Sequence, residues 1–595
     1  MLITYLFNLF IVLPNKIKQA LVLSFIGSCF SLNANAVDVK VYYLKHTDWE
    51  DVVTARDLKF CKKAGSCGTI EVVSKNKINI IWDTKKREEF SFDLERKQWV
   101  LDVNLDSLIQ DEYEQFVYTF EEPYIKINPY GRTPLSALIK FPTDEETQIS
   151  IRIKAKENGQ DIIHHFKEFK KEHEIPLLGL YPNYDNKIVL EAKNKKNEKK
   201  VVHLTVPVSD ILWHEQWFVV NKNDNKFHYY ATYDGSVYDE YGNLRYLFKS
   251  NGWVQHYFYK DSVFVEYKNG INQYSILGKK LKSYQYPEGF YGYMHGMGFK
   301  DNGNIIIFGT IDGNTALIDG EAKETNRDIV LEFDAKTGKV IEKYDLAEML
   351  NPDRSLIIKS ADLEYSKVDW THTNGVDYDA KNKAIILSGR HIGIIKIDEK
   401  SKKPIWWLTP HQLTHKSGRN GDKGDISHLL LTAVDKNKKP YSKKVQKGIE
   451  KADGFKWPLK THNVKYIGNG LYSILDNSGE MYDKSLYTTK NSVASVFKID
   501  DKAKTVQQLF LKELSDYSDM GSVVIVHPKT QEYWVFSSHV SSFNSKEVYN
   551  GVMRRFDKKG KEVYKAIIHK DSNGWIYLIQ PYQFYSDENW LTPHD

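Results

Sequence analysis

From about residue 210 onward, short apolar runs alternate with polar turns along the chain. The runs are rich in Tyr, Ile, Val, Phe and Trp, the turns are rich in Asn, Asp and Gly, and helical periodicity is confined to a stretch near LAEMLN at 346–351. Short runs bounded by such turn residues are typical of β-strands, whose side chains alternate between two faces. The sequence therefore predicts an all-β fold for this region.

One type of hairpin recurs six times in this region. Its turns fall near Gly242, near Gly278, and directly after Asp334, Asp398, Asp500 and Asp557. Residues 211–595 number 385, or about 64 in each unit, which exceeds the roughly 40 to 50 of common propeller repeats and leaves room for loop insertions. The largest insertion, at roughly 411–456, is Lys-rich. We expect a six-bladed β-propeller over 210–595, with four strands in each blade.

A second type of hairpin carries a histidine at a recurring position. In THNVKYIGNGLYSILDNS, His462 lies eight residues before Gly470 in the turn. In MHGMGFKDNGNIIIFG, His295 lies eight residues before Gly303 in the turn. A third stretch, DWTHTNGVDYDAKNKAIILSGRH, opens with His372. This second type of hairpin would form the inner strands of each blade, next to the central channel. Corresponding positions on inner strands converge on the axis of a propeller, so the pattern predicts that the three histidines share one pocket.

Strand alternation suggests which polar residues accompany them. Residues i and i+2 share a face, which would place Asn374 beside His372, whereas Arg390 and His391 would face opposite ways. We expect Arg390 to face the channel and His391 to pack or to form hydrogen bonds. A lone histidine on a strand is usually structural, but three at matching places beside an arginine indicate a functional site.

Such a site is open to two kinds of chemistry. Three histidines are a known zinc-ligand set, but the fixed positive charge of Arg390 would repel a metal ion, and no acidic partner is evident at a fixed spacing. A tetrahedral oxyanion fits better, because arginine, histidine and asparagine all offer N–H donors, and a neutral histidine can act as a nucleophile. A metal-dependent hydrolase and a non-enzymatic binding propeller are the alternatives.

Residues 37 to about 209 predict a separate β domain. ETQISIRIKAKENG and NKIVLEAKNKKNEKKVVHLTVPV alternate like the strands of a sandwich at about 120–209, and GQDIIHHFKEFKKEH at 159–173 allows at most one short helix. The domain shows no pattern typical of a catalytic site.

Residues 1–36 are interpreted as a signal peptide. Lysines precede the apolar run ALVLSFIGSCFSL, and the small residues ANA at 34–36 follow it as a cleavage site. The run is shorter than the about 20 residues that cross a bilayer. This predicts a periplasmic protein, and the alternative is a lipid anchor on Cys29 within IGSC.

Either route leaves the same two cysteines with a thiol in the mature chain, Cys61 and Cys67, because a lipid anchor would occupy Cys29. In an oxidising compartment an even number of cysteines predicts a disulfide, which a periplasmic thiol oxidase would form. The charges are balanced, with 83 Lys and Arg against 78 Asp and Glu, so that the net charge of +5 gives no indication of nucleic-acid binding.

The ordered motifs MHGMGFKDNGN, DWTHTNGVDYD, IILSGRH, IWWLTPH and THNVKYIGNG with ILDNS resemble those of the bacterial PAPS-independent arylsulfate sulfotransferases. NPYGRTPLSALIKF and IPLLGLYPNYDNKIVL resemble the N-terminal β-sandwich domain of that family, so the similarity runs from about Asn128 to the C-terminus. It implies a periplasmic six-bladed propeller that moves a sulfuryl group from a phenolic sulfate donor to an acceptor phenol, with no metal, nucleotide donor or other cofactor.

The resemblance also implies roles for single residues. His462 matches the nucleophile that forms a sulfohistidine intermediate in a ping-pong reaction. The residues that match positions around the sulfuryl oxygens are His295, His372, Asn374 and Arg390. Gly296 departs from the family, because many members have an acidic residue there, and Ser522 is our candidate for a substrate-binding hydroxyl from the last blade. Some members are homodimers.

Overall fold

The computed structural model describes five strands between residues 59 and 101 and most of the chain after them. The later described ranges are 105–157, 159–211, 216–224, 226–250, 254–318, 320–350, 363–364, 367–411, 427–479, 485–527, 530–541, 548–570 and 576–585. The predicted signal peptide and Cys29 lie outside the described residues. The chain divides into two compact units, 1–110 and 111–595.

The first unit contains one antiparallel sheet in which the strands follow chain order. Its strands are β1 (Lys59–Cys61), β2 (Cys67–Ser74), β3 (Lys77–Trp82), β4 (Arg87–Asp93) and β5 (Gln98–Leu101). The register of β1 and β2 sets Cys61 directly opposite Cys67. Helix α4 (Leu105–Glu114) comes next in the chain.

The second unit begins with a six-stranded β domain built around one long strand, β7 (Ser136–Ile153), which pairs with four others. The remaining strands are β6 (Tyr124–Ile127), β8 (Ile162–His165), β9 (Lys170–Leu178), β10 (Tyr184–Asn194) and β11 (Lys199–Val208). The stretch at 159–173 forms strands rather than a helix. In β9, His173, Ile175 and Leu177 are buried in alternation against β7, and this packing overrides the local helical pattern.

Among the described residues, six further sheets each contain an antiparallel run of four strands. The first joins β13 (Tyr229–Thr232), β14 (Ser236–Asp239) and β15 (Leu244–Leu247) to β42 (Ile579–Tyr582) near the end of the described chain. The second contains β16 (Gln255–Tyr259), β17 (Ser262–Tyr267), β18 (Gly270–Ser275) and β19 (Lys280–Gln285). The third contains β20 (Phe290–Phe299), β21 (Ile305–Ile311), β24 (Ile329–Phe333) and β25 (Val340–Asp345).

The other three sheets follow the same plan. The fourth contains β28 (Thr373–Asp379), β29 (Ala384–Gly389), β30 (Gly393–Asp398) and β31 (Pro404–Leu408). The fifth contains β33 (Thr461–Gly468), β34 (Leu471–Asp476), β35 (Val493–Asp500) and β36 (Thr505–Glu513). The sixth contains β38 (Val523–Val526), β39 (Tyr533–Ser541), β40 (Val548–Phe556) and β41 (Glu562–Lys570), extended by β37 (Tyr517–Ser518) and β12 (Gln216–Lys222).

Short elements occupy the connections between these strands. They are β22 (Thr315–Ile318), β23 (Glu321–Glu324), α5 (Leu346–Met349), β26 (Leu363–Glu364), β27 (Lys367–Val368), a 3₁₀ turn (Ser427–Leu429), β32 (Thr432–Ala433) and α6 (Lys443–Gln446). Asp345 caps the predicted helix α5 by accepting from the backbone N–H of Ala347. Among the described residues, no helix has the length and apolar character needed to cross a membrane.

The six repeated hairpins predicted from the sequence are confirmed as β14–β15, β18–β19, β24–β25, β30–β31, β35–β36 and β40–β41. Several close on an aspartate whose side chain satisfies the turn. Oδ1 of Asp557, for example, accepts from the backbone N–H groups of Lys559 and Lys561, both at 2.9 Å. Such side-chain bonds make Asp a strong local signal for a turn.

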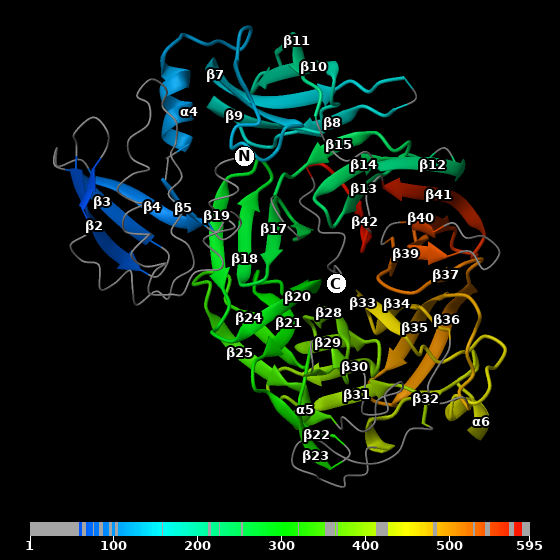
Figure 1. Ribbon diagram of the computed structural model, residues 1–595. Helices are drawn as coiled ribbons and strands as arrows, with labels where there is room; N and C mark the ends of the chain where they lie inside the picture. Colours follow the sequence, from blue (N-terminus) through cyan, green and yellow to red (C-terminus); the bar gives the residue numbers. More distant parts are fainter. Residues whose placement is uncertain are drawn as a thin grey trace. The chain divides into compact units, whose positions relative to one another are not determined.

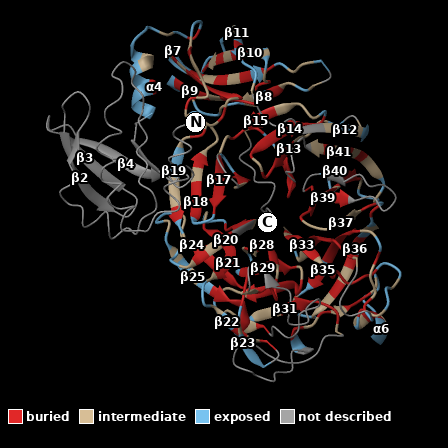
Figure 2. Ribbon diagram, viewed as in Figure 1, coloured by how far each residue is buried: buried red, intermediate tan, exposed pale blue. Residues whose placement is uncertain are grey.

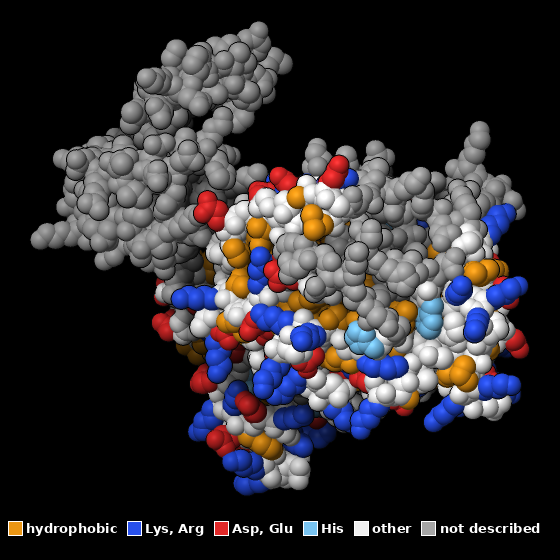
Figure 3. All heavy atoms as spheres, turned by 90° about the horizontal axis from the view of Figure 1, so that it is seen from below, with side chains coloured by type: hydrophobic (Ala, Val, Ile, Leu, Met, Phe, Trp, Pro, Cys, Tyr) orange, Lys and Arg blue, Asp and Glu red, His pale blue; other side chains and the backbone are white. Residues whose placement is uncertain are grey.

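The sheets follow one another in chain order around a common centre (Figure 1). Their first strands contact each other, since β20 meets β28, β28 meets β33, and β33 meets β38. Buried residues concentrate in the strands of these sheets (Figure 2). The described part of the face in Figure 3 carries Lys and Arg side chains interspersed with Asp and Glu.

Candidate active site

The structure brings His295, His372 and His462 together, and Tyr577 lies beside two of them. The ring centroids of His295 and His372 are 6.4 Å apart. The ring of Tyr577 lies 5.0 Å from that of His295 and 6.3 Å from that of His462. His295 lies on β20 and His462 on β33, whereas Tyr577 comes just before β42. Strands that are far apart in the sequence therefore supply one cluster.

His462 is buried and is held in one tautomer. Its Nδ1 lies 2.5 Å from Oδ1 of Asn477. The amide of Asn477 is itself oriented, because its Nδ2 donates to the backbone carbonyl of Ser518 at 2.7 Å. Since the oxygen of that amide can only accept, Nδ1 of His462 carries the hydrogen, and Nε2 holds a lone pair.

The surroundings of His462 keep its imidazole neutral. Burial and then the positive charge of Arg390 lower the pKa of His462 well below its ordinary value, and the other two histidines add to this effect. A neutral imidazole with an available lone pair is the form of histidine that acts as a nucleophile.

His372 is engaged through both ring nitrogens. Its Nδ1 lies 2.5 Å from Oδ2 of Asp369, and Nη1 of Arg327 donates to its Nε2 at 3.0 Å. His372 precedes β28 and has a φ of 44°, so strand alternation does not govern the direction of its side chain. Asp369, three residues before His372, is an acidic partner of this histidine, whereas Gly292 and Leu459 hold the corresponding positions before His295 and His462, so no acidic residue recurs at a fixed spacing.

Asn374 lies in β28, two residues after His372, and its side chain bonds to the neighbouring strand β33. Its Nδ2 donates to the carbonyl of Thr461 at 2.7 Å, and its Oδ1 accepts from the hydroxyl of Ser388 at 3.0 Å. Oδ1 also lies 3.4 Å from the backbone nitrogen of Asn463. These bonds fix Asn374 between β28 and β33.

Arg390 and His391 occupy the turn between β29 and β30. The backbone N–H of Arg390 donates to the carbonyl of His372 at 3.0 Å, and its charge lowers the pKa of both His372 and His462. His391 is buried, and its Nδ1 lies 2.7 Å from the backbone carbonyl of Asp369. The charge of Arg390 thus acts on the histidine cluster, while His391 binds the backbone of Asp369, the residue that contacts His372.

Ser522 is fully buried beside Tyr577. Its backbone N–H donates to the carbonyl of Tyr577 at 3.1 Å. Its hydroxyl accepts from the N–H of Ser538 at 2.9 Å and lies 2.8 Å from the hydroxyl of Ser518. These bonds tie Ser522 to the frame of the pocket.

Several residues around the cluster have a left-handed backbone, which side chains with a Cβ rarely adopt. The φ angles are 56° at Arg327, 44° at His372, 52° at Asn463 and 87° at Ser522. Such conformations cost on the order of 1 to 3 kcal/mol each and persist where the surrounding structure enforces them, often at functional sites.

Residues 208–577 match the family model described as arylsulfotransferase (ASST), and residues 124–209 match the arylsulfotransferase Ig-like domain. The chain belongs to the arylsulfotransferase family. The resemblance drawn from the motifs is therefore confirmed, and the protein is an enzyme of the arylsulfate sulfotransferase family.

Two relatives of this arylsulfotransferase illustrate the distance within the family. The arylsulfate sulfotransferase AssT of Escherichia coli O6:H1 is 22% identical over 539 residues, covering 73% of this chain and 88% of the relative. The arylsulfate sulfotransferase AssT of Lelliottia amnigena is 23% identical over 541 residues, covering 74% and 88%. Among solved structures, BamB from Moraxella catarrhalis is 8% identical with a TM-score of 0.25, covering 72% of this chain and 98% of that one, and this likeness carries no argument.

Four residues of the arylsulfotransferase site were missed by sequence reasoning. Asp369 and Asn477 stand in the motifs DWTH and ILDNS. Asp369 lies three residues from His372 in the chain, and Asn477 lies at the far end of the hairpin that begins with His462, so the motifs themselves were the available signal. Arg327 and Tyr577 carry no such signal, because they come from segments outside the histidine hairpins and are brought in only by the fold.

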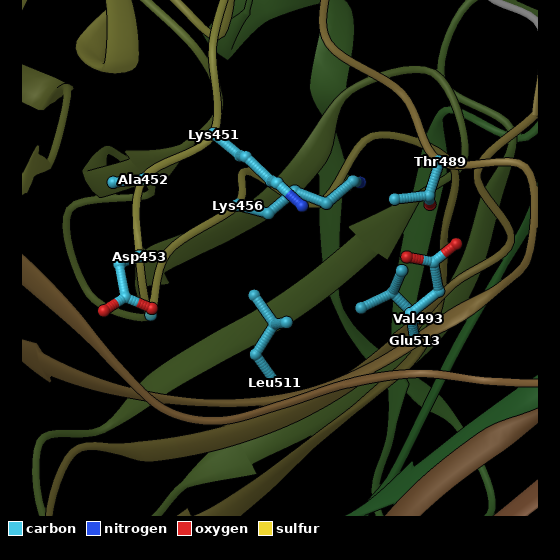
Figure 4. Close-up of a pocket in the computed structure, with 9 residues that line it drawn as sticks. Lys451, Ala452, Asp453, Lys456, Thr489, Val493, Leu511 and Glu513 are labelled. Carbon is cyan, nitrogen blue, oxygen red and sulfur yellow. The ribbon is translucent and has the colours of Figure 1, made fainter.

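Among the described residues, no group of three or more His, Cys, Asp or Glu side chains is arranged to hold a metal ion. A pocket of about 390 Å³ lies elsewhere, against the insertion and the sheet of β35 and β36, and none of its nine lining residues is a histidine. Lys451 and Lys456 extend into it, opposite Glu513 (Figure 4). This pocket is separate from the histidine cluster.

Proposed function

We propose that this arylsulfotransferase moves a sulfuryl group from a phenolic sulfate ester to an acceptor phenol by a ping-pong reaction through a sulfohistidine on His462. The observation that carries the proposal is the bond between His462 and Asn477, which leaves a lone pair on Nε2 of a buried, neutral imidazole.

In the first step, Nε2 of His462 attacks the sulfur atom while the bond from sulfur to the aryl oxygen breaks. The electron pair of that bond leaves with the aryl oxygen, which then takes a proton. Arg390, His295 and Asn374 are the proposed partners of the non-bridging oxygens. His372 matches a position around the same oxygens, but its two ring nitrogens are bound to Asp369 and Arg327, so it is not counted among the donors. Contacts that tighten as charge redistributes in the transition state lower the barrier.

In the second step, an acceptor phenol loses its proton to a neighbouring histidine, and its oxygen attacks the sulfur atom. The bond between nitrogen and sulfur breaks, and its electron pair returns to Nε2. A phenol has a pKa of about 10, as the tyrosine side chain does, so a phenolate leaves far more readily than an alkoxide. Aryl sulfates are therefore the proposed substrates, rather than alkyl sulfates.

The proposed frame is a six-bladed propeller in which β42 completes the first blade. The six four-stranded sheets and the contacts between their first strands support it. We also propose that the protein is periplasmic, on the pattern at 1–36, and that Cys61 and Cys67 form a disulfide. A lipid anchor on Cys29 and a homodimer are testable by the mass of the mature chain and by its oligomeric state.

The proposal is tested by intact-mass spectrometry of the protein mixed with 4-nitrophenyl sulfate, without acceptor, and quenched rapidly at neutral to alkaline pH. The expected result is a gain of one SO₃ on the peptide that contains His462, which is lost when phenol is added. His462→Ala should abolish the gain and the turnover, whereas His165→Ala, at an exposed position of the N-terminal domain, should change neither. Release of nitrophenol from a protein of unchanged mass would overturn the sulfohistidine.

A further inference from the structure

We propose that Arg327 is a positioning residue that withdraws His372 from proton transfer, so that His295 is the histidine that exchanges a proton with the aryl oxygen. The inference rests on the proposed function, which leaves two histidines beside the nucleophile as candidates for that role.

The partners of His372 allow a single arrangement of its hydrogen. A carboxylate only accepts and a guanidinium only donates, so Nδ1 carries the hydrogen towards Asp369 and Nε2 accepts from Arg327. His372 can take a proton only after its bond to Arg327 breaks. It can give one only from the nitrogen that Asp369 holds. Both steps are therefore unfavourable in this frame.

Arg327 is itself fixed in place. Its backbone N–H donates to the hydroxyl of Thr310 at 3.0 Å, and its carbonyl accepts from the hydroxyl of Thr371 at 2.9 Å. The side chain is buried, and its Nε lies 3.8 Å from Oδ2 of Asp369. Asp369, His372 and Arg327 thus each contact the other two, and Arg327 has a left-handed backbone with a φ of 56°.

The charges that face His372 also keep it neutral. They come from every neighbouring segment, namely Asp369, Arg327, Arg390, His391 and His295. Burial, then Arg327, and then Arg390 and His295 lower the pKa of His372 well below its ordinary value. Removal of Arg327 would take away a positive charge beside His372, while the negative charge of Asp369 would remain. The pKa of His372 would therefore rise.

The ring of His295 lies 5.0 Å from that of Tyr577 and 6.4 Å from that of His372, and Tyr577 also adjoins the nucleophile, His462. It lies in β20 where the pairing with β21 is interrupted between Gly292 and Met297, and it is half-buried. In the proposed cycle, protonated His295 gives its proton to the departing aryl oxygen. Neutral His295 then takes the proton of the acceptor phenol as that oxygen attacks sulfur, so the proton count closes over one turnover.

The first test compares two donors whose aryl oxygens leave with different ease, phenyl sulfate and 4-nitrophenyl sulfate. A group that protonates the leaving oxygen matters most for the poorer leaving group. His295→Asn is expected to reduce kcat/KM for phenyl sulfate at least tenfold more than for 4-nitrophenyl sulfate, and His372→Asn is expected to reduce both by the same factor. The reverse pattern, or equal effects in both variants, would overturn the assignment.

The second test follows kcat/KM against pH in variants of Arg327. In Arg327→Gln the acid limb of the profile should move to higher pH, because His372 then titrates, and the rate should fall by about 10²-fold, as when a catalytic site loses its positioning. Arg327→Lys should restore the wild-type limb in part, and Arg152→Gln, which changes an exposed arginine of the N-terminal domain, should leave the profile unchanged. A limb that stays in place in folded Arg327→Gln would refute the role of Arg327. Formation of sulfated wild-type enzyme tests the nucleophile separately, so the two proposals fail in different experiments.

Discussion

Nδ1 of His462 lies 2.5 Å from Oδ1 of Asn477. The two residues belong to one hairpin, because His462 is in β33 and Asn477 directly follows β34. Asn469 and Gly470 form the turn of this hairpin with φ angles of 51° and 71°, the pattern of a tight two-residue connection. A local element of the chain therefore delivers the proposed nucleophile together with the group that sets its tautomer.

This pair predicts the effects of two substitutions at Asn477. Asn477→Leu should lower kcat about 10²-fold, because the reactive nitrogen is no longer held in position. Asn477→Asp should keep the orientation but raise the pKa of His462, since a carboxylate favours the imidazolium. The acid limb of the pH–rate profile should then move to higher pH, which steady-state kinetics between pH 5 and 9 would detect. An unchanged limb in Asn477→Asp would show that Asn477 does not set the state of the nucleophile.

The bonds of Asn374 predict that it contributes to stability. Asn374→Ala would leave the hydroxyl of Ser388 and the carbonyl of Thr461 buried without this partner, at a cost of about 1 to 3 kcal/mol for an unsatisfied group. The free energy of unfolding in urea should fall by that amount. An unchanged urea midpoint would contradict the bridge between β28 and β33. The proposed role of Asn374 as a ligand of the sulfuryl group stays a prediction, and kcat/KM of the folded variant tests it.

A buried lysine predicts a clamp between neighbouring sheets. Nζ of Lys396 bonds to Asp379 at 2.7 Å within its sheet and to Asp501, in the β35–β36 turn of the next sheet, at 2.6 Å. Lys396→Met should destabilise the fold by about 3 to 5 kcal/mol, because it leaves a buried carboxylate unpaired. The matched control is Lys402→Met, whose partner Glu342 is 41% exposed, as Lys402 is, and its effect should stay within about 0.5 kcal/mol. Equal effects of the two variants would disprove the clamp.

Buried histidines predict that the fold weakens as the pH falls below about 6.5. Burial lowers the pKa of His228, His256 and His391 to about 3, 4 and 3. Each folded pKa lies below that of the unfolded chain, so the unfolded chain binds protons first and stability drops between the two values. Each such histidine contributes about 1.4 kcal/mol per pH unit.

Four carboxyl groups among the described residues oppose this effect. Burial raises the pKa of Glu240 to about 7 and that of Asp328 to about 6, and it also raises the pKa of Asp239 and Asp377, so the folded chain holds these protons first as the pH falls. The histidines, including the two site histidines with lowered pKa, outnumber them, and the net slope keeps its sign. Urea unfolding at pH 7.5, 6.5 and 5.5 measures it. Greater stability at pH 5.5 than at pH 7.5 would contradict the prediction.

The register of β1 and β2 predicts that Cys61 and Cys67 are joined in the exported protein. Residues directly opposite each other on antiparallel strands have Cα atoms about 4.5 to 5.5 Å apart, within the range that a disulfide spans. Alkylation of the unfolded, unreduced mature protein should add no mass, and alkylation after reduction should add two groups. Two alkylated thiols before reduction would rule the disulfide out.

Local patterns in the sequence determined the strands, the six repeated hairpins and the three histidine hairpins of this arylsulfotransferase. Apolar alternation and the turn chemistry of Asp, Asn and Gly act over a few residues, and for that reason they are legible without a structure. The grouping of His295, His372 and His462 also followed from the repeats, because equivalent positions of repeated units occupy equivalent places in the fold.

The tertiary structure alone decided which partners these histidines have. Arg327 is 45 residues from His372 in the chain, and Tyr577 comes from the end of the described chain, so no local pattern links either to the cluster. A left-handed backbone at His372 and Arg327 also overrides strand alternation, which is the rule that sequence reasoning used to orient side chains. The tautomers, charges and bonds of the site depend on these long-range contacts, and packing between sheets sets them.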